Sequence, residues 1–243
     1  VFGDTGSATF SGSLAVNLTA TFDAGGNDEI TTGAGHDLIF GGSGADTINA
    51  GEGDNVVFGD QGEIDFTDGY ATSMVSATAT NDGDDEIETG SGSDVVLGGG
   101  GNDTITVGVG VNGEGANTVL GDHGTILRAL DYTVLTTTHV TSGDLGIGGN
   151  DIITGGNGDD LVIAGAGADE VYVGEGNNVV LGDEGRVETA NFLFTVIESS
   201  SASFDDYIAV GEGSGTDYIL GGGGSDTIIA GSLLVSGDGI NVL

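Results

Sequence analysis

Residues 41–49 read Gly41-Gly42-Ser43-Gly44-Ala45-Asp46-Thr47-Ile48-Asn49, and this stretch decides the fold of the chain because its pattern recurs. The pattern is G-G-x-G-x-D-x-U-x, where U is a large apolar residue, and residues 155–163 match it at every fixed position. Its first part needs backbone angles that glycine adopts without steric cost. Its last three residues turn the middle side chain away from its neighbours if they are extended. Each nonapeptide therefore predicts a glycine-rich turn followed by a short strand.

A nine-residue step carries the pattern along the chain in four sets, each with three aspartates and a closing asparagine. The sets are Asp28, Asp37, Asp46 and Asn55; Asp85, Asp94, Asp103 and Asn117; Asp151, Asp160, Asp169 and Asn178; and Asp206, Asp217, Asp226 and Asn241. The step is stretched by five residues around 110–114, and by small insertions near Gly213 and Leu233. Twelve aspartates in register exclude a chance match in a glycine-rich chain.

The middle strand positions are almost all β-branched, which suits a stacked ladder of strands. They are Ile30, Ile39, Ile48, Val57, Ile87, Val96, Ile105, Val119, Ile153, Val162, Val171, Val180, Ile208, Ile219, Ile228 and Leu243. Together they predict a thin core, two side chains across.

A longer period is marked by an asparagine, an apolar run and Gly-Asp-x-Gly, as in residues 55–62. The first glycines of three such markers, Gly59, Gly121 and Gly182, lie 62 and 61 residues apart. Residues 1–6 and 241–243 also fall inside this marker, so we expect the segment to belong to a longer array. The period predicts four units, 1–62, 63–124, 125–185 and 186–243. Their repeat blocks are 24–62, 82–124, 145–185 and 205–243, preceded by inserts at 7–23, 63–81, 125–144 and 186–204.

The inserts alternate apolar with polar residues, as in Leu14 to Phe22, which is a strand signal. Asp68-Gly69 near the middle of one insert favours a hairpin, although irregular coils continuing the repeats are the alternative. Two roles stay open for these segments. They either cap and join neighbouring blocks, protecting exposed edges, or make lateral contacts with further copies of the chain.

The charge balance limits the partners of the chain. Its 243 residues carry a formal charge of −37, and Arg128 and Arg186 are the only permanent positive charges. Such a charge opposes compaction unless something neutralises it, and hard multivalent cations suit carboxylate oxygens. Nucleic acid and anionic membranes are poor partners, and no apolar run is long enough for a transmembrane segment. The start shows no positively charged region of a signal peptide.

On these nonapeptides, the chain resembles the RTX (repeats-in-toxin) calcium-binding family over about two-thirds of its length. The resemblance implies an all-β fold, a right-handed parallel β-roll or β-solenoid, here in short blocks with hairpin-like inserts between them. It implies two nonapeptides per coil, three-residue strands in two sheets and calcium in the six-residue turns. It also implies a large bacterial protein, extracellular or at the cell surface, and secreted by the type I route.

Two nonapeptides per coil would place each turn about 4.8 Å from the turn two positions further along. The expected pairs are Asp28 over Asp46, Asp37 over Asn55, Asp85 over Asp103 and Asp151 over Asp169. Two bare carboxylates about 5 Å apart repel by roughly 3 kcal/mol at an effective dielectric constant of about 20. A calcium ion between successive turns reverses that sign, and we expect about two to three ions per unit.

The predicted calcium ligands are the sixteen residues of the four sets together with Asp60, Asp122 and Asp183. Asp4 has the equivalent place at the start. Each closing asparagine lowers the local charge and keeps an oxygen ligand, with the marker aspartate supplying the missing carboxylate from the next turn. Alternatively, the asparagine only tolerates the turn and forms a hydrogen-bonded ladder.

We expect no enzyme. The histidines His36, His123 and His139 occupy variable positions without metal-ligand spacing, and no nucleophile elbow or phosphate-binding lysine is present. The sequence therefore favours a structural or adhesive array, such as a spacer, filament or surface-layer element. The alternative is an accessory module for secretion or stabilisation of a toxin or hydrolase. A flat ligand- or ice-binding face is disfavoured, because the outward strand positions are mixed in type.

Overall fold

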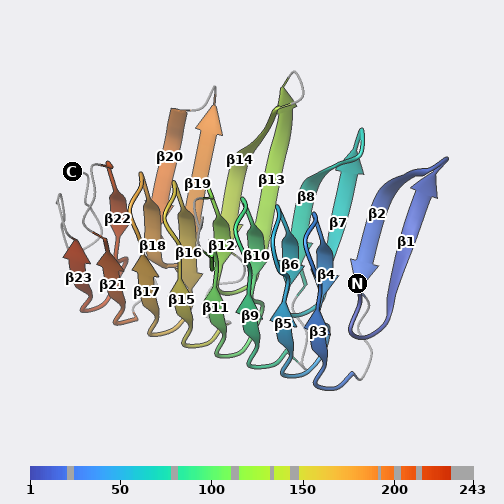
Figure 1. Ribbon diagram of the computed structural model, residues 1–243. Helices are drawn as coiled ribbons and strands as arrows, with labels where there is room; N and C mark the ends of the chain where they lie inside the picture. Colours follow the sequence, from blue (N-terminus) through green and yellow to red (C-terminus); the bar gives the residue numbers. More distant parts are fainter. Residues whose placement is uncertain are drawn as a thin grey trace.

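The computed structural model describes residues 1–20, 25–77, 82–110, 115–131, 134–142, 148–190, 193–199, 204–211 and 215–230. This part of the chain is all-β, with three sheets and no helix, and so with no helix that could cross a membrane. The three sheets lie in layers, and the strands follow one another in a row from β1 at one end to β23 at the other (Figure 1).

The two parallel sheets are built from the nonapeptide strands. We call the first the outer sheet; it contains β3 (Glu29–Thr31), β5 (Thr47–Asn49), β9 (Glu86–Glu88), β11 (Thr104–Thr106), β15 (Ile152–Thr154), β17 (Glu170–Val173), β21 (Tyr207–Val210) and β23 (Thr227–Ala230). We call the second the central sheet; it contains β4 (Leu38–Phe40), β6 (Val56–Phe58), β10 (Val95–Leu97), β12 (Thr118–Leu120), β16 (Leu161–Gly165), β18 (Val179–Asp183) and β22 (Tyr218–Leu220). Successive nonapeptides alternate between the two sheets, so each strand pairs with the one two nonapeptides away.

The register places equivalent residues side by side. Ile30 is opposite Ile48 in the outer sheet, and Ile39 is opposite Val57 in the central sheet. The predicted middle positions therefore face one another between the two sheets, and those from Ile30 to Ile219 are at most 7% exposed. Ile228 is partly buried against the same cluster, and Leu243 lies outside the described residues.

The repeat blocks are not separate, which corrects the expectation of short blocks. Strand β5 pairs with β9, β11 with β15 and β17 with β21, each pair spanning an insert. The central sheet continues in the same way through β6–β10, β12–β16 and β18–β22. The reason is that each insert leaves and returns at one place, so the next nonapeptide continues the existing ladder of strands.

The inserts form hairpins rather than irregular coils. Their strands are β1 (Gly6–Ser11), β2 (Leu14–Ala20), β7 (Gly62–Thr67), β8 (Tyr70–Ser76), β13 (Gly124–Asp131), β14 (Val134–Ser142), β19 (Gly185–Ala190) and β20 (Leu193–Ser199). Asp68 and Gly69 both have positive φ, 52° and 86°, as the tight turn between β7 and β8 requires. The hairpins also pair with one another into a single antiparallel sheet, which we call the hairpin sheet.

A second apolar core lies between the central sheet and the hairpin sheet. Phe40 and Phe58 point from the central sheet and stack with ring centroids 4.7 Å apart. Ile64 and Met74 meet them from β7 and β8, and all four are at most 1% exposed. The central sheet is therefore covered on both faces, and its strands read as continuous apolar runs.

Candidate metal centres

The turns that lead into the outer sheet stack their final aspartates into one continuous row. The backbone N–H of Asp28 donates to Oδ1 of Asp46 at 2.7 Å, and that of Asp46 donates to Oδ1 of Asp85 at 2.8 Å. We call this row the aspartate ladder; its members are Asp28, Asp46, Asp85, Asp103, Asp151, Asp169, Asp206 and Asp226. The stacking expected within the blocks is present, and it also crosses each insert.

The turns on the opposite edge stack in the same way but alternate aspartate with asparagine. We call this row the mixed ladder; it runs through Asp37, Asn55, Asp94, Asn117, Asp160, Asn178 and Asp217. Its backbone-to-Oδ1 distances are 2.9–3.1 Å. The predicted member Asn241 lies outside the described residues.

The second carboxylate oxygen of the aspartate ladder is buried without a hydrogen-bond partner. This holds for Oδ2 of Asp28, Asp46, Asp85, Asp103, Asp151, Asp169 and Asp206. A buried carboxylate oxygen with no donor is costly, and such oxygens are normally paired or coordinate a metal. Seven of them in one row therefore indicate a row of cation sites.

Backbone carbonyls converge on the same oxygens. A Cβ built on Gly41 would collide with the carbonyl oxygen of Gly59 and with Oδ2 of Asp46. A Cβ on Gly98 would likewise meet the carbonyl oxygen of Gly121 and Oδ2 of Asp103. The first glycine of the turn thus keeps a carboxylate and a carbonyl from neighbouring turns close together. Calcium takes six to eight oxygen ligands of these two kinds, so the residues present fit calcium.

The pKa values show how strongly the aspartate ladder needs a positive charge. Burial first, and the carboxylate of Asp103 second, raise the pKa of Asp85 to about 9 from 3.8. Burial, followed by the charges of Asp103 and Asp122, raises the pKa of Asp151 to about 10. In the mixed ladder, burial raises the pKa of Asp160 only to about 6, because hydrogen bonds from Asn117 oppose the effect. The demand for a cation is therefore greatest at Asp85 and Asp151 of the aspartate ladder.

The asparagines of the mixed ladder are satisfied by hydrogen bonds. Nδ2 of Asn55 donates to the carbonyl oxygen of Gly53 at 2.8 Å and to Oδ1 of Asp94 at 3.1 Å. Its Oδ1 accepts from the backbone N–H of Asp37 at 3.0 Å. Asn117 and Asn178 make the equivalent bonds to the next aspartate. Of the two interpretations of these asparagines, the hydrogen-bonded ladder is the one whose contacts are present.

The marker aspartates lie beside the aspartate ladder, which corrects the expectation that they complement the asparagines. Asp60 accepts from the backbone N–H of Gly100 at 2.8 Å, inside the next turn of that edge. Asp4, Asp122 and Asp183 accept from the equivalent turns at 2.5–3.1 Å. The reason is that Asn55 and Asp60 flank the strand β6, and the two ends of a strand face opposite edges of the sheet.

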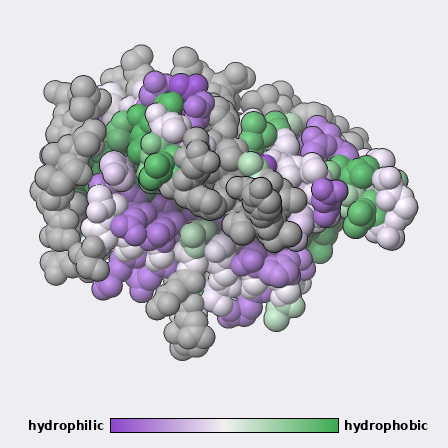
Figure 2. Space-filling view, turned by 90° about the horizontal axis from the view of Figure 1, so that it is seen from above, coloured by the Kyte–Doolittle hydropathy of each residue, from purple (hydrophilic) through white to green (hydrophobic). Residues whose placement is uncertain are grey.

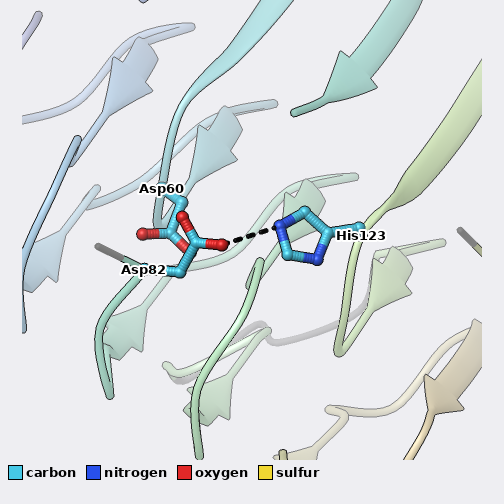
Figure 3. A group of neighbouring side chains, drawn as sticks. All are labelled: Asp60, Asp82 and His123. Carbon is cyan, nitrogen blue, oxygen red and sulfur yellow. Dashed lines mark ion pairs between the residues drawn. The ribbon is translucent and has the colours of Figure 1, made fainter. Parts of the chain in front are cut away.

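One cluster of possible metal ligands was not predicted from the sequence. Asp60, Asp82 and His123 bring ligand atoms within 4.8 Å of one another, and Nε2 of His123 lies 3.2 Å from Oδ2 of Asp82 (Figure 3). His123 is 2% exposed, although its variable position suggested no role. The sequence does contain a sign of this group, because Asp82 and His123 each stand where the other units have a different residue. His36 instead lies exposed beside Asp54, and the side chain of His139 lies outside the described residues.

Comparison with known proteins agrees with the turn geometry. A model of the RTX calcium-binding nonapeptide repeat matches four times, at residues 23–57, 80–112, 145–180 and 211–232. The matches cover a little over half of the 243 residues and describe a calcium-binding repeat rather than a catalytic domain. The comparison with curated proteins found no match. Given four matched segments that each contain the stacked turns, the chain belongs to the RTX calcium-binding nonapeptide repeat family.

Proposed function

We propose that this chain is a calcium-dependent structural and adhesive array of an extracellular bacterial protein. In this proposal the two parallel sheets are the walls of a right-handed β-roll, folded and neutralised by calcium between successive turns. The observation that carries the proposal is the row of buried Oδ2 atoms along the aspartate ladder, each without a hydrogen-bond partner. The chain itself has no catalytic task in this function.

The magnitudes support folding by calcium. Extracellular calcium modules bind with dissociation constants of about 10⁻⁴–10⁻³ M. At free calcium roughly tenfold above that, each site adds about 1.4 kcal/mol. On the order of eight sites, or about two per unit, then add about 11 kcal/mol, which is comparable to the stability of a whole domain.

The decisive experiment is circular dichroism of the chain with calcium and with excess chelator. We expect a strong β spectrum in millimolar calcium and a largely unfolded spectrum in chelator, since the carboxylates of the aspartate ladder then repel one another. Magnesium serves as the control cation, because its smaller octahedral shell does not suit these turns. A β spectrum that survives excess chelator at neutral pH would contradict the proposal.

The hairpin sheet supplies the adhesive part of the proposal. Its inner face covers the central sheet, which agrees with a capping role. The hairpin sheet also carries exposed apolar side chains. They are Phe10 (60% exposed), Leu14 (54%), Leu193 (70%) and Phe194 (45%). Figure 2 views the molecule from above and shows hydrophobic patches there, one toward the end where β1 and β2 lie. We propose that these side chains contact further copies of the chain.

The alternative function is an accessory calcium module that serves secretion or stabilisation of a toxin or hydrolase domain. Membership of the RTX family favours it, since this repeat is typical of secreted bacterial proteins. Electron microscopy of the purified chain in millimolar calcium separates the two functions. Ordered filaments or sheets support the structural array, and isolated short rods favour the accessory module.

A further inference from the structure

We propose that Asp60, Asp82 and His123 form a second kind of cation site, which takes a divalent transition metal of the zinc class rather than calcium. The three residues come from three places in the chain. Asp60 follows β6, Asp82 lies three residues before the ladder aspartate that leads into β9, and His123 follows β12. The fold brings their side chains together (Figure 3).

The separation between His123 and Asp82 suits two neighbouring ligands of a small tetrahedral ion. Ligand atoms of the three residues all lie within 4.8 Å of one another, and Nε2 of His123 is 3.2 Å from Oδ2 of Asp82. Two neighbouring ligands of a tetrahedral ion with bonds of about 2.0 Å are about 3.3 Å apart. Asp60 is 1% exposed and the side chain of His123 is 3% exposed, so the group is shielded from water.

The donor set separates this site from the calcium turns. Calcium is bound by oxygen ligands in proteins, whereas zinc accepts imidazole nitrogen together with carboxylate oxygen. Two carboxylates also balance the charge of a divalent ion, with a neutral imidazole as the third ligand. The turns of the aspartate ladder bring a carboxylate and a backbone carbonyl together, but here a ring nitrogen lies near two carboxylates (Figure 3).

Asp82 is a departure from the repeat. The equivalent position before the ladder aspartate is Gly25 in the first unit and Gly148 in the third. A Cβ at Gly148 would collide with the carboxylate of Asp122, which is the counterpart of Asp60. At Asp82 the chain instead places a second carboxylate beside the first. Two buried carboxylates side by side are unfavourable unless a cation lies between them.

His123 is the matching departure in the marker. The same position holds Thr5, Gln61 and Glu184 in the other markers. The amide of Gln61 donates to Oγ of Ser43 at 2.5 Å, so a neutral side chain fills this place by hydrogen bonding. Among the described residues, an imidazole is combined with two carboxylates at this one position, and one of these carboxylates belongs to the extra aspartate, Asp82.

An ion pair between His123 and Asp82 would leave one buried oxygen of Asp60 without a partner. A protonated His123 paired with Asp82 neutralises the charge of one carboxylate only. Oδ1 of Asp60 is buried and has no hydrogen-bond partner, and Nδ1 and Nε2 of His123 have no hydrogen bond either. A metal ion bound by all three residues satisfies the Asp60 oxygen and one ring nitrogen together.

The test is isothermal titration of zinc into the calcium-saturated chain, with His123→Gln as the variant. Glutamine occupies the equivalent position 61, so the variant is expected to fold, and circular dichroism in calcium checks this. We expect one tight zinc ion per chain, weakened by more than roughly 100-fold in the variant, since even an outer-shell partner is worth about 10–100-fold. His36→Gln is the matched control, because His36 is exposed outside the group and its loss should leave zinc affinity unchanged.

Cobalt supplies an independent readout. The proposal requires visible absorption bands of four-coordinate cobalt in the chain, and their loss in His123→Gln and in Asp82→Gly. Absence of zinc binding in the calcium-saturated chain, or equal binding by chain and variant, overturns it and leaves an ion pair or a calcium ion at this place. Either outcome leaves calcium-dependent folding intact, so the two proposals fail separately.

Discussion

Six aspartates of the aspartate ladder, from Asp46 to Asp206, divide their two carboxylate oxygens between two tasks. Oδ1 of Asp103 accepts the backbone N–H of Asp85 at 2.8 Å, whereas its Oδ2 is buried without a hydrogen bond. The first contact fixes the turn and needs only an acceptor. The second oxygen needs a positive charge. An asparagine at the same position would keep the acceptor for the backbone N–H but would lose the oxygen that binds a cation.

Asp103→Asn is therefore expected to change stability in opposite directions with and without calcium. In millimolar calcium the variant loses about one site, worth about 1.4 kcal/mol. Without calcium it is expected to be more stable than the parent, because it removes a carboxylate whose pKa burial raises to about 7. Chemical denaturation in millimolar calcium measures the loss, and the fraction of the β spectrum that remains in excess chelator measures the gain.

Asp68→Asn is the matched control for that variant, because Asp68 lies in the hairpin turn outside both ladders and asparagine tolerates its positive φ of 52°. Its stability should be equal to that of the parent in both conditions. A loss of stability in Asp103→Asn of the same size with and without calcium would refute the division of tasks.

The raised pKa values also predict the pH dependence of the calcium-free chain. Burial is the main cause that raises the pKa of Asp60 to about 9 and that of Asp206 to about 8, from 3.8. Between pH 3.8 and those values the folded state binds more protons than the unfolded chain, so its stability falls as pH rises. In calcium-free buffer, circular dichroism should show the β spectrum appearing on acidification toward about pH 4. A calcium-free fold that becomes more stable as pH rises would exclude this account.

At the scale of elements, the two kinds of nonapeptide strand differ in what covers them. Outer strands such as β9, Glu86–Glu88, bury only their middle residue, whereas central strands such as β10, Val95–Leu97, bury all three. The difference is visible in the sequence, as Glu-Ile-Glu against Val-Val-Leu. The three apolar residues in a row indicate that such a central strand is covered on both faces.

The second core makes the hairpins part of the folded unit. Phe58→Ala is expected to cost about 3–5 kcal/mol in calcium, because Phe58 is fully buried and stacks on Phe40. Thermal denaturation measures the loss. Phe10→Ala is the matched control, since Phe10 is 60% exposed and its loss should change stability by less than about 0.5 kcal/mol. Equal costs for the two variants would mean that the hairpins do not share a core with the central sheet.

At the scale of the whole molecule, three sheets pass through all the units. The parallel sheets continue across each insert, and the hairpins join edge to edge beside them. A cation bound between two turns therefore stabilises neighbouring units together. We propose that the exposed apolar residues on the hairpins are where such an array contacts another.

Association of copies is expected to depend on those hairpin residues. A variant with Phe10, Leu14 and Leu193 changed to serine should remain folded in calcium but sediment as a smaller species than the parent. The control replaces Ile152 and Ile229 of the outer sheet by threonine; both are exposed, at 44% and 52%, but lie away from the hairpins. Analytical ultracentrifugation in millimolar calcium compares them. A monomeric parent chain would show that copies do not associate through the hairpins. Equal loss of association in both variants would place the contact elsewhere.

Features that depend on neighbours along the chain could be predicted from the sequence. The nine-residue period located the turns, the strands and the buried middle positions. The two nonapeptides per coil that the family resemblance implies paired Asp28 with Asp46 and Asp85 with Asp103, as the structure shows. These follow because a short repeat leaves the backbone few ways to stack. The hairpin at Asp68-Gly69 was equally local, since its turn needs two positive φ angles.

Features that depend on where the chain returns after an insert became clear only from the three-dimensional fold. It joined the blocks into continuous sheets, paired the hairpins with one another and moved Asp60 to the edge opposite Asn55. It also brought Asp82 to His123, 41 positions further along the chain. No local pattern specifies these contacts, because each insert can change the distance along the chain without changing the position in space to which the chain returns.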